Sequence, residues 1–351
     1  MYMNPFIAKT QRVFPMQGRA DYLRYDMNEN PEGLPEAFVE SVKREITPEF
    51  LATYPEPDRF LHKYADYIGT DFERVVATNG SDMAIRYLLE TFGEVGKEVV
   101  TVAPSFEMYW VNCSILGYKH VPVAYNDDLT IDIARIEQAI TPNTRVVVLL
   151  NPNNPVGNVY TDEEAERIVK KADQVGALVI IYEAYHYFYK NTFIDLTKRY
   201  DNVAILRTFS KLFSLAACRL GVIIGSPAII EGAKKAKLTF DVNSIALLFG
   251  ERLLEHPEIE QQLIEIEKKG KAYTLKDLQA HGYNCRDCRG NFIFVEPHTS
   301  TKKLAERLYQ EKKVLVKTFG NELLERYLRV SVGSVAAMTK FLDAFYSLDK
   351  D

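Results

Sequence analysis

The sequence predicts an α/β protein: a large domain with a mostly parallel sheet covered by helices, joined to a smaller α+β domain from the two chain ends. Three features predict it. Short β-branched runs alternate with helical patterns through the middle of the chain, several of these runs are apolar throughout, and the pattern changes at about Leu253. An apolar run without alternation is typical of a parallel strand that is covered on both faces.

The predicted elements of the large domain follow this alternation. The strands are short β-branched runs at Arg74–Ala77, Glu98–Ala103, Arg145–Leu150, Leu178–Tyr182, Val203–Arg207 and Leu220–Gly225. Helical patterns fill the intervals at Asp82–Thr91, Phe106–Leu116, Asp132–Ala139, Asp162–Val175 and Pro227–Lys237. Because strands that alternate with helices form βαβ units, we expect a parallel sheet with helices on its faces.

The C-terminal part has a different order of elements. A long charged helix comes first, followed by segments at Asn291–Glu296, Thr301–Gln310, Lys313–Lys317 and Tyr327–Val332 and by a last helix from Val335. The first 35 or so residues are rich in Pro, Asn and Gly and have no partner strand nearby. We expect them to pack on the C-terminal part. This gives a large domain over residues 36–255 and a small domain over residues 1–35 and 256–351.

Composition narrows the class of protein. The chain is 47% hydrophobic and 26% charged with a net charge of -5, which favours neither nucleic acid nor an anionic membrane surface as a partner. No apolar run approaches the roughly 20 residues that span a bilayer. The four cysteines do not form a disulfide framework and no signal segment follows Met1, so we expect a cytoplasmic protein. Cys285 and Cys288 form a C-x-x-C without a second pair, so we expect no metal site.

A lysine and several phosphate-binding side chains follow one predicted strand. The segment Thr208–Gly221 begins at the carboxyl end of that strand, where open α/β sheets bind ligands. Apolar neighbours can desolvate Lys211, which lowers the pKa of an amine and makes it a nucleophile that forms Schiff bases. Thr208, Ser210 and Arg219 offer two hydroxyls and a guanidinium to a phosphate. Alternatively, these residues are a plain loop lysine and a helix arginine.

The motif Thr208-x-Ser-Lys211, with Arg219 eight residues after the lysine, resembles the signature of fold-type I aminotransferases, closest to histidinol-phosphate aminotransferase. The similarity extends across nearly the whole chain. It implies that Lys211 forms a Schiff base with pyridoxal 5'-phosphate and that the hydroxyls and Arg219 bind the cofactor phosphate. Asn79-Gly80-Ser81-Asp82 follows a strand and opens a helix, whose N–H groups and dipole attract anions. In the family this turn also takes the phosphate, although alone it could be a capped turn.

Further motifs extend the resemblance to the cofactor ring. Asn151–Gly157 resembles the N-P-x-N-P-x-G element, which implies that Asn154 bonds the ring hydroxyl. Tyr185 matches a tyrosine that bonds the same hydroxyl. Tyr109 matches the aromatic side chain that stacks on the pyridine ring, although it could equally be a core residue. Tyr54 matches a tyrosine that reaches the phosphate in the other subunit, which implies a homodimer with shared active sites.

The sequence departs from the family at the ring nitrogen. The family has D-E-A-Y where this chain has Tyr182-Glu-Ala-Tyr185, so Tyr182 replaces the aspartate that keeps the pyridine nitrogen protonated. Glu183 should point to the opposite face of its strand. A phenol, with a reference pKa of about 10, cannot fix a pyridinium as a carboxylate does. The departure indicates a variant with a neutral or otherwise protonated ring, an engineered or damaged site, or a paralogue with poor turnover.

The substrate side also departs from the resemblance. Arg329 matches the arginine that holds the anionic group of the substrate, although it could instead be an exposed arginine in an ion pair. Lys317 stands where the family has an arginine. Phe14 occupies the place of a tyrosine that touches the substrate phosphate. The turn of Asn28, Glu29, Asn30 and Pro31 is retained on the substrate side.

The favoured function is pyridoxal-phosphate-dependent transamination, with glutamate as the expected amino donor and a small phosphate-bearing carbonyl compound as the acceptor. After the donor displaces it, Lys211 would carry the proton as general acid and base. The first alternative is decarboxylation of a phosphorylated amino acid on the same scaffold, with the changes at Lys317 and Phe14 reorienting the substrate. The second is a non-catalytic cofactor-binding protein, suggested by Tyr182.

Overall fold

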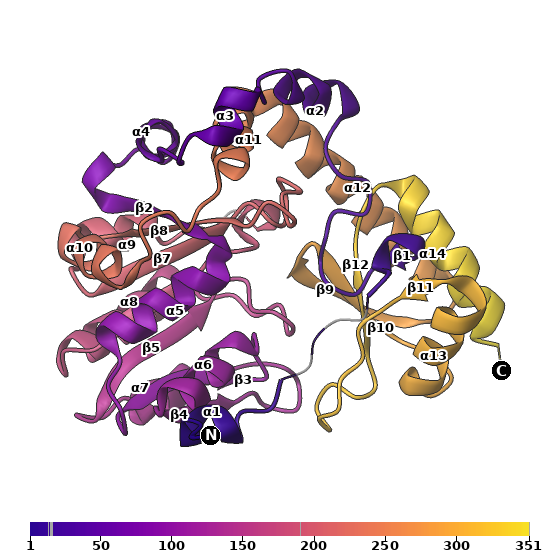
Figure 1. Ribbon diagram of the computed structural model, residues 1–351. Helices are drawn as coiled ribbons and strands as arrows, with labels where there is room; N and C mark the ends of the chain where they lie inside the picture. The colour runs from indigo at the N-terminus through magenta and orange to yellow at the C-terminus, as the bar shows by residue number, and fades with distance from the viewer. Residues whose placement is uncertain (13, 15–16, 190, 351) are drawn as a thin grey trace.

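The computed structural model describes residues 1–12, 14, 17–189 and 191–350. Its main feature is a seven-stranded sheet in the order β2-β8-β7-β6-β5-β3-β4 (Figure 1). The strands are β2 (Val75–Asn79), β3 (Glu98–Ala103), β4 (Lys119–Ala124), β5 (Thr144–Leu150), β6 (Leu178–Tyr182), β7 (Val203–Thr208) and β8 (Leu220–Gly225). β8 is antiparallel to both of its neighbours and the other pairs are parallel, which confirms the predicted, mostly parallel sheet.

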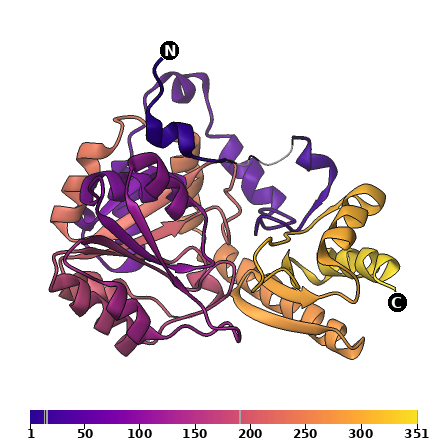
Figure 2. The same cartoon turned by 90° about the horizontal axis from the view of Figure 1, so that it is seen from below.

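Helices pack around this sheet (Figures 1 and 2). They are α1 (Pro5–Lys9), α2 (Glu36–Lys43), α3 (Pro48–Ala52), α4 (Asp58–Ile68), α5 (Gly80–Phe92), α6 (Met108–Leu116), α7 (Ile133–Ala139), α8 (Asp162–Asp173), α9 (Ile194–Arg199), α10 (Pro227–Ala236) and α11 (Ser244–Leu254). Short 3-10 turns lie at η1 (Arg19–Asp21), η2 (Phe72–Arg74) and η3 (His186–Phe188). Local signals define α8, where Thr161 and Glu164 form a capping box that satisfies free N–H groups of the first turn.

The rest of the chain forms a second body around two small sheets. A three-stranded antiparallel sheet has the order β12-β10-β9, and β1 pairs with β11 in parallel. The elements are β1 (Leu23–Arg24), α12 (Pro257–Ala280), β9 (Asn284–Gly290), β10 (Phe292–Glu296), α13 (Thr301–Lys312), β11 (Val314–Leu315), β12 (Leu328–Ser331) and α14 (Val335–Leu348). The pairing of β1 with β11 joins the N-terminal segment to the C-terminal part, as the sequence predicts.

The first residues depart from that expectation, because α1 packs on α6 beside the large sheet. Phe6 of α1 lies so close to Gly117 that a Cβ there would be 2.6 Å from the Phe6 ring. Two separate hydrophobic cores accompany the two bodies. Ile259 and Leu263, near the start of α12, belong to the first core, and Leu278, near its end, belongs to the second. A helix of this length, about 36 Å, is long enough to join both cores. The exact division into domains stays a prediction.

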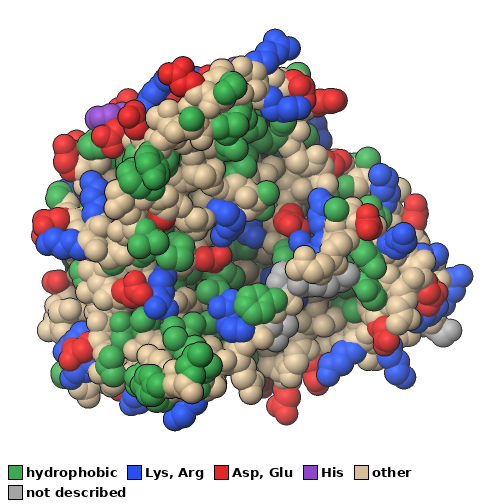
Figure 3. Space-filling model, in the orientation of Figure 1, with side chains coloured by type: hydrophobic (Ala, Val, Ile, Leu, Met, Phe, Trp, Pro, Cys, Tyr) green, Lys and Arg blue, Asp and Glu red, His purple; other side chains and the backbone are tan. Residues whose placement is uncertain are grey.

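The carboxyl ends of the parallel strands β5, β6 and β7 face the second body (Figure 1). Figure 3 shows that, on the face of the molecule drawn there, Lys and Arg side chains are mixed with Asp and Glu side chains. Among the described residues, no helix is both long and apolar enough to cross a membrane. The arrangement places the ends of three strands opposite β12 and the segment that precedes it, which is where the candidate site lies.

Candidate active site

A cavity of about 720 Å³ lies between the carboxyl ends of the large sheet and the second body. Its wall combines the residues that follow β6 and β7, the first turn of α5, residues 26–27 and residues 316–321. The predicted site residues in this wall are Ser81, Asp82, Asn154, Tyr182, Tyr185, Thr208, Ser210, Lys211, Arg219, Lys317 and Arg329. The fold therefore brings together predicted residues that lie far apart in the chain.

One end of the cavity is an anion cradle, formed by the first turn of α5 and Arg219. Gly80 has a left-handed φ of 69°, and its N–H donates to the Arg219 carbonyl at 2.9 Å. A Cβ on Gly80 would lie 2.4 Å from Arg219 Nη2, so only glycine leaves room for the guanidinium. Nη2 also pairs with Asp82 at 3.0 Å, and Nη1 lies 3.4 Å from Ser210 Oγ. The N–H groups of a helix start and a guanidinium together suit a phosphate.

Lys211 lies in the turn that follows β7, at the centre of the wall. The half-buried side chain places Nζ 2.8 Å from the Met27 carbonyl oxygen, to which it donates, and 6.0 Å from the centre of the Tyr185 ring. Phe209 and Phe213, stacked 4.9 Å apart and buried, support this turn from behind. The lysine is thus held on an apolar base with its amine directed to the cavity.

A polar network runs along the side of the cavity next to Lys211. The Tyr185 hydroxyl accepts from Asn28 Nδ2 at 2.9 Å and from Asn154 Nδ2 at 3.2 Å. Because both of these neighbours donate, the hydroxyl proton of Tyr185 is available for an acceptor in the cavity. Arg329 donates to the side-chain oxygen of Asn154 and to the carbonyl of Asp26. Arg329 is only 6% exposed, so an anion that reached its guanidinium would be bound in a largely desolvated position.

Tyr182 lies at the end of β6, where the resemblance leads one to expect an aspartate. Its hydroxyl lies 2.8 Å from Ser81 Oγ, and burial raises the pKa of the phenol well above its ordinary value. The Phe106 ring stacks on Tyr182 with a centroid distance of 5.8 Å and an interplanar angle of 20°. Tyr109 meets Tyr182 edge to face at 6.2 Å, and is buried behind it. Phe106 lines the cavity, and Tyr109 does not. The sequence motifs had pointed to Tyr109 and not to Phe106.

Glu183 points away from the cavity, which confirms the expected alternation along β6. Its carboxylate is fully buried and pairs with Arg207 at 2.9 Å. It also accepts from the Thr192 hydroxyl and from the Phe193 N–H at 2.6 Å. Because these partners already occupy the Glu183 carboxylate on the far face, it does not substitute for the missing aspartate in the cavity.

Asn30, Phe14 and Tyr54 also lie outside the cavity wall in this single chain. Asn30 is half-buried and donates to Ser214 Oγ at 2.8 Å, behind the Lys211 turn. Phe14 is 74% exposed, and its neighbours 13 and 15 lie outside the described residues. Tyr54 is 73% exposed and stacks on Phe240 with the ring centroids 4.4 Å apart. Tyr54 faces solvent, and its expected contact with another subunit stays a prediction.

The substrate side of the wall comes from the second body. Lys317 and Arg329 exchange two backbone hydrogen bonds of 3.1 and 2.9 Å, so this bridge fixes their spacing. The Lys317 side chain is exposed, whereas that of Arg329 is buried. Asp26 and Met27, whose carbonyls contact Arg329 and Lys211, could not be predicted as site residues, because backbone acceptors have no residue-type signal.

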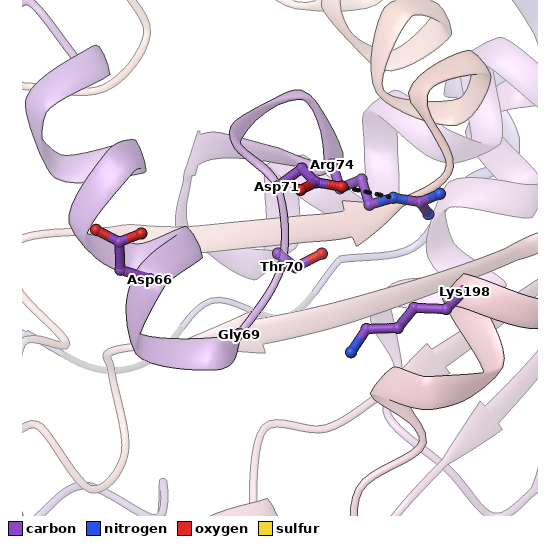
Figure 4. Close-up of a pocket in the computed structure, with 6 residues that line it drawn as sticks. All are labelled: Asp66, Gly69, Thr70, Asp71, Arg74 and Lys198. Atoms are coloured by element: carbon purple, nitrogen blue, oxygen red, sulfur yellow. Dashed lines mark ion pairs between the residues drawn. The ribbon is translucent and has the colours of Figure 1, made fainter.

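A second hollow of about 490 Å³ lies elsewhere, between the end of α4 and α9 (Figure 4). Charged side chains of both signs line it, and Arg74 and Asp71 form an ion pair of 3.7 Å there. Asp66 and Lys198 complete the charged lining together with Gly69 and Thr70. Its lining contains no aromatic ring and no lysine on an apolar base, so it lacks the combination of groups found in the larger cavity.

Known proteins share both the sequence and the fold of this chain. The histidinol-phosphate aminotransferase of Thermotoga sp. (strain RQ2) is 32% identical to this chain, over 90% of this chain and 92% of the relative. That of Clostridium novyi is 30% identical, over 93% of this chain and 91% of the relative. The histidinol-phosphate aminotransferase of Sinorhizobium meliloti in complex with pyridoxal-5'-phosphate superposes with a TM-score of 0.87 at 21% identity, covering 99% of this chain and 98% of that one.

An aspartate aminotransferase from Thermotoga maritima superposes with a TM-score of 0.84 at 22% identity, covering 98% of this chain and 99% of that one. The sequence profile of aminotransferase class I and II matches residues 20–345, which include the whole cavity wall. The chain therefore belongs to the aminotransferase class I and II family.

Proposed function

We propose that this chain uses pyridoxal 5'-phosphate to transfer an amino group from a donor, expected to be glutamate, to a small carbonyl compound that bears a phosphate. The observation that carries the proposal is the cavity, which places an amine, an anion cradle and a buried guanidinium around one space. Histidinol-phosphate aminotransferases 30–32% identical to this chain support the same activity. When bound, the cofactor supplies an electron sink for the bond that breaks at the amino acid Cα.

The residues present fit this cofactor. First-turn N–H groups and the Arg219 guanidinium together suit a phosphate, and Gly80 leaves the guanidinium its place, because a Cβ there would lie 2.4 Å from it. We assign the phosphate to the main-chain N–H groups of Ser81 and Asp82 and to the side chains of Thr208, Ser210 and Arg219, with Gly80 leaving room for the guanidinium. We assign the aldehyde to Lys211 and the ring hydroxyl to Asn154 and Tyr185, whose mutual hydrogen bond keeps both side chains on one side of the cavity.

Two cations select the substrate. Arg329 is buried and shaped for bidentate contact, so we assign it the carboxylate of the amino donor. Lys317 is exposed at the rim and offers a point charge, which suits the phosphate or other anion of the acceptor. Lys211, once free, is the nearby amine that holds and returns the proton. Its contact with the Met27 carbonyl must open when the amine takes up this role.

We also propose that two copies of the chain form a homodimer. An exposed apolar patch lies around α3 and the segment before α11, and comprises Leu51 (64% exposed), Tyr54, Leu238 (70%) and Phe240 (53%). Figure 3 shows hydrophobic side chains on the surface over α3. An exposed cluster of this kind is a feature of association surfaces, and a two-fold contact would carry Tyr54 toward the partner's cavity.

Four free cysteines support the cytoplasm as the compartment.

A half-reaction tests the function. Purified protein is loaded with pyridoxal 5'-phosphate, mixed with glutamate, other amino acids or amino phosphates, and followed by the absorbance of the cofactor and by release of the keto acid. A spectral change with stoichiometric keto acid supports transamination, and Lys211→Ala should abolish it. Release of carbon dioxide without a keto acid would favour the decarboxylase alternative. No change with any donor would favour the non-catalytic alternative. The aminotransferase relatives favour neither of them.

A further inference from the structure

Tyr182 introduces a neutral hydroxyl pair into the floor of the cavity. The side chain is 5% exposed, and its hydroxyl and Ser81 Oγ lie 2.8 Å apart. Ser81 and the phenol therefore satisfy each other without an ionic partner. The stacked Phe106 ring and the buried Tyr109 ring enclose the phenol from the side of α6 and the segment before it. Neither ring carries a charge, so these neighbours do not favour ionisation of Tyr182.

The charged groups near Tyr182 belong to the anion cradle. Asp82 on α5 and Arg219 before β8 form an ion pair of 3.0 Å, and both side chains are about two-fifths exposed. Tyr185, on the same segment as Tyr182, accepts hydrogen bonds from two side-chain amides. Asp82 is thus engaged with a guanidinium, and Glu183 is engaged with Arg207 on the far face. Because Asp82 and Glu183 are both paired with arginines, the Tyr182 phenol is the polar group at this end of β6.

The chemistry of the cofactor places its ring nitrogen opposite the carbon that carries the aldehyde. The phosphate arm is attached next to the aldehyde carbon on one side, and the ring hydroxyl is next to it on the other. With the phosphate in the cradle, the hydroxyl beside Asn154 and Tyr185 and the aldehyde at Lys211, the nitrogen faces the wall away from Lys211. Of the cavity-lining residues, Tyr182 is the one at the end of β6 that links this wall to the cradle through Ser81.

We propose that Tyr182 holds the pyridine nitrogen of the bound cofactor in its uncharged form, with the phenol as donor and the nitrogen as acceptor of one hydrogen bond. This inference rests on the proposed cofactor site. A carboxylate at this position would favour the protonated ring through its charge, whereas a neutral phenol does not. The hydroxyl can turn from Ser81 to the ring, because a hydroxyl hydrogen rotates freely. The bound cofactor is then a weaker electron sink than one paired with a carboxylate.

Tyr182 then sets the rate of the reaction and not the attachment of the cofactor. The lysine, the cradle and the polar network on the hydroxyl side are present in this structure, so the cofactor should bind and react with Lys211 normally. Replacement by aspartate should return the charge, raise the rate of transamination and shift the absorption of the bound cofactor. If Tyr182→Asp changed neither, position 182 would not face the ring nitrogen.

Nitrogen NMR tests the inference directly. The holoenzyme is prepared with pyridoxal 5'-phosphate labelled with ¹⁵N in the ring, and the chemical shift of the nitrogen is compared with those of free pyridine and pyridinium forms. We expect the value of a hydrogen-bonded pyridine in the natural protein, that of a free pyridine in Tyr182→Phe, and the pyridinium value in Tyr182→Asp. Tyr109→Phe is the matched control, because it removes a buried hydroxyl that only borders Tyr182 and should leave the shift unchanged. A pyridinium value in the natural protein overturns the inference, even if Tyr182→Asp fails to fold.

Borohydride reduction followed by peptide mass spectrometry tests cofactor attachment separately from the role of Tyr182. A cofactor fixed on Lys211 together with a pyridinium signal would refute only the role of Tyr182. Absence of any fixed cofactor would refute the proposed function first, because the ring would then not be held in this cavity.

Discussion

Gly80→Ala is the sharpest probe of the anion cradle. The methyl group would lie 2.4 Å from Arg219 Nη2 and 2.9 Å from Cζ, so the guanidinium must move. The backbone of Gly80 has a φ of 69°, which a residue with a Cβ adopts at a cost of about 1–2 kcal/mol. The variant should therefore lose stability and, in addition, the contacts of Arg219 with a bound phosphate.

The two effects have different magnitudes and can be measured apart. A hydrogen bond to a charged group contributes about 1.5–3 kcal/mol, so loss of the Arg219 contact should weaken binding of pyridoxal 5'-phosphate about 10- to 150-fold. Absorbance or fluorescence titration of the cofactor-free protein measures this change. Pyridoxal, which lacks the phosphate, should bind the variant and the natural protein alike. Urea unfolding measures the loss of stability.

Gly176→Ala separates strain from the loss of Arg219. Gly176 has a nearly identical φ of 70°, and among the described residues no atom lies within 4 Å of the position that its Cβ would take. Its alanine variant should show the backbone cost alone, with unchanged cofactor affinity. Equal affinity of Gly80→Ala and Gly176→Ala for pyridoxal 5'-phosphate would show that Arg219 does not hold the phosphate.

Three further changes probe other parts of the molecule. Burial raises the pKa of Glu267 from 4.5 to about 7, despite the Lys271 ammonium 3.2 Å away. Because the folded state disfavours the ionised carboxylate, the free energy of unfolding should fall as the pH rises from 4.5 to about 7. Glu267→Gln should remove a pH dependence on the order of 3 kcal/mol from the free energy of unfolding measured with urea. The same pH dependence in the variant and the natural protein would contradict this expectation. Gly157→Ala would place a Cβ 2.2 Å from a backbone oxygen at a φ of 79°, and should destabilise the fold by about 2–5 kcal/mol. Arg329→Lys should raise KM for the amino donor at least about tenfold, because it loses bidentate contact, and an unchanged KM would argue against a carboxylate there.

Sequence patterns predicted most of the large sheet, because its central strands are apolar without interruption. The strand β4 was missed, since Lys119, His120 and Pro122 break the apolar run at this edge position. The sequence patterns also missed the helices α1, α2, α3, α4, α9 and α11. The pattern could not show that α1 packs on α6, because that contact depends on the fit of Phe6 against Gly117 between segments distant in the chain.

The candidate site was predictable where a residue type identifies its chemistry. Lys211, Arg219 and Arg329 lie in one cavity wall, as the motifs suggested. Phe106 and Tyr109 are three positions apart, and the sequence could not show which of them faces the cavity, because that depends on how the chain enters α6. The contacts of Lys211 with the Met27 carbonyl had no sequence signal for a similar reason, since every residue has a carbonyl.

Ser81 connects the anion cradle with Tyr182. Its main chain belongs to the first turn of α5, which forms the cradle, and its side chain bonds the Tyr182 hydroxyl. A phosphate that draws α5 closer to Arg219 would move Ser81 and therefore change the partner available to the phenol. The effects of changes at Gly80 and Tyr182 on the reaction rate should therefore not be additive, because both changes alter the surroundings of Ser81.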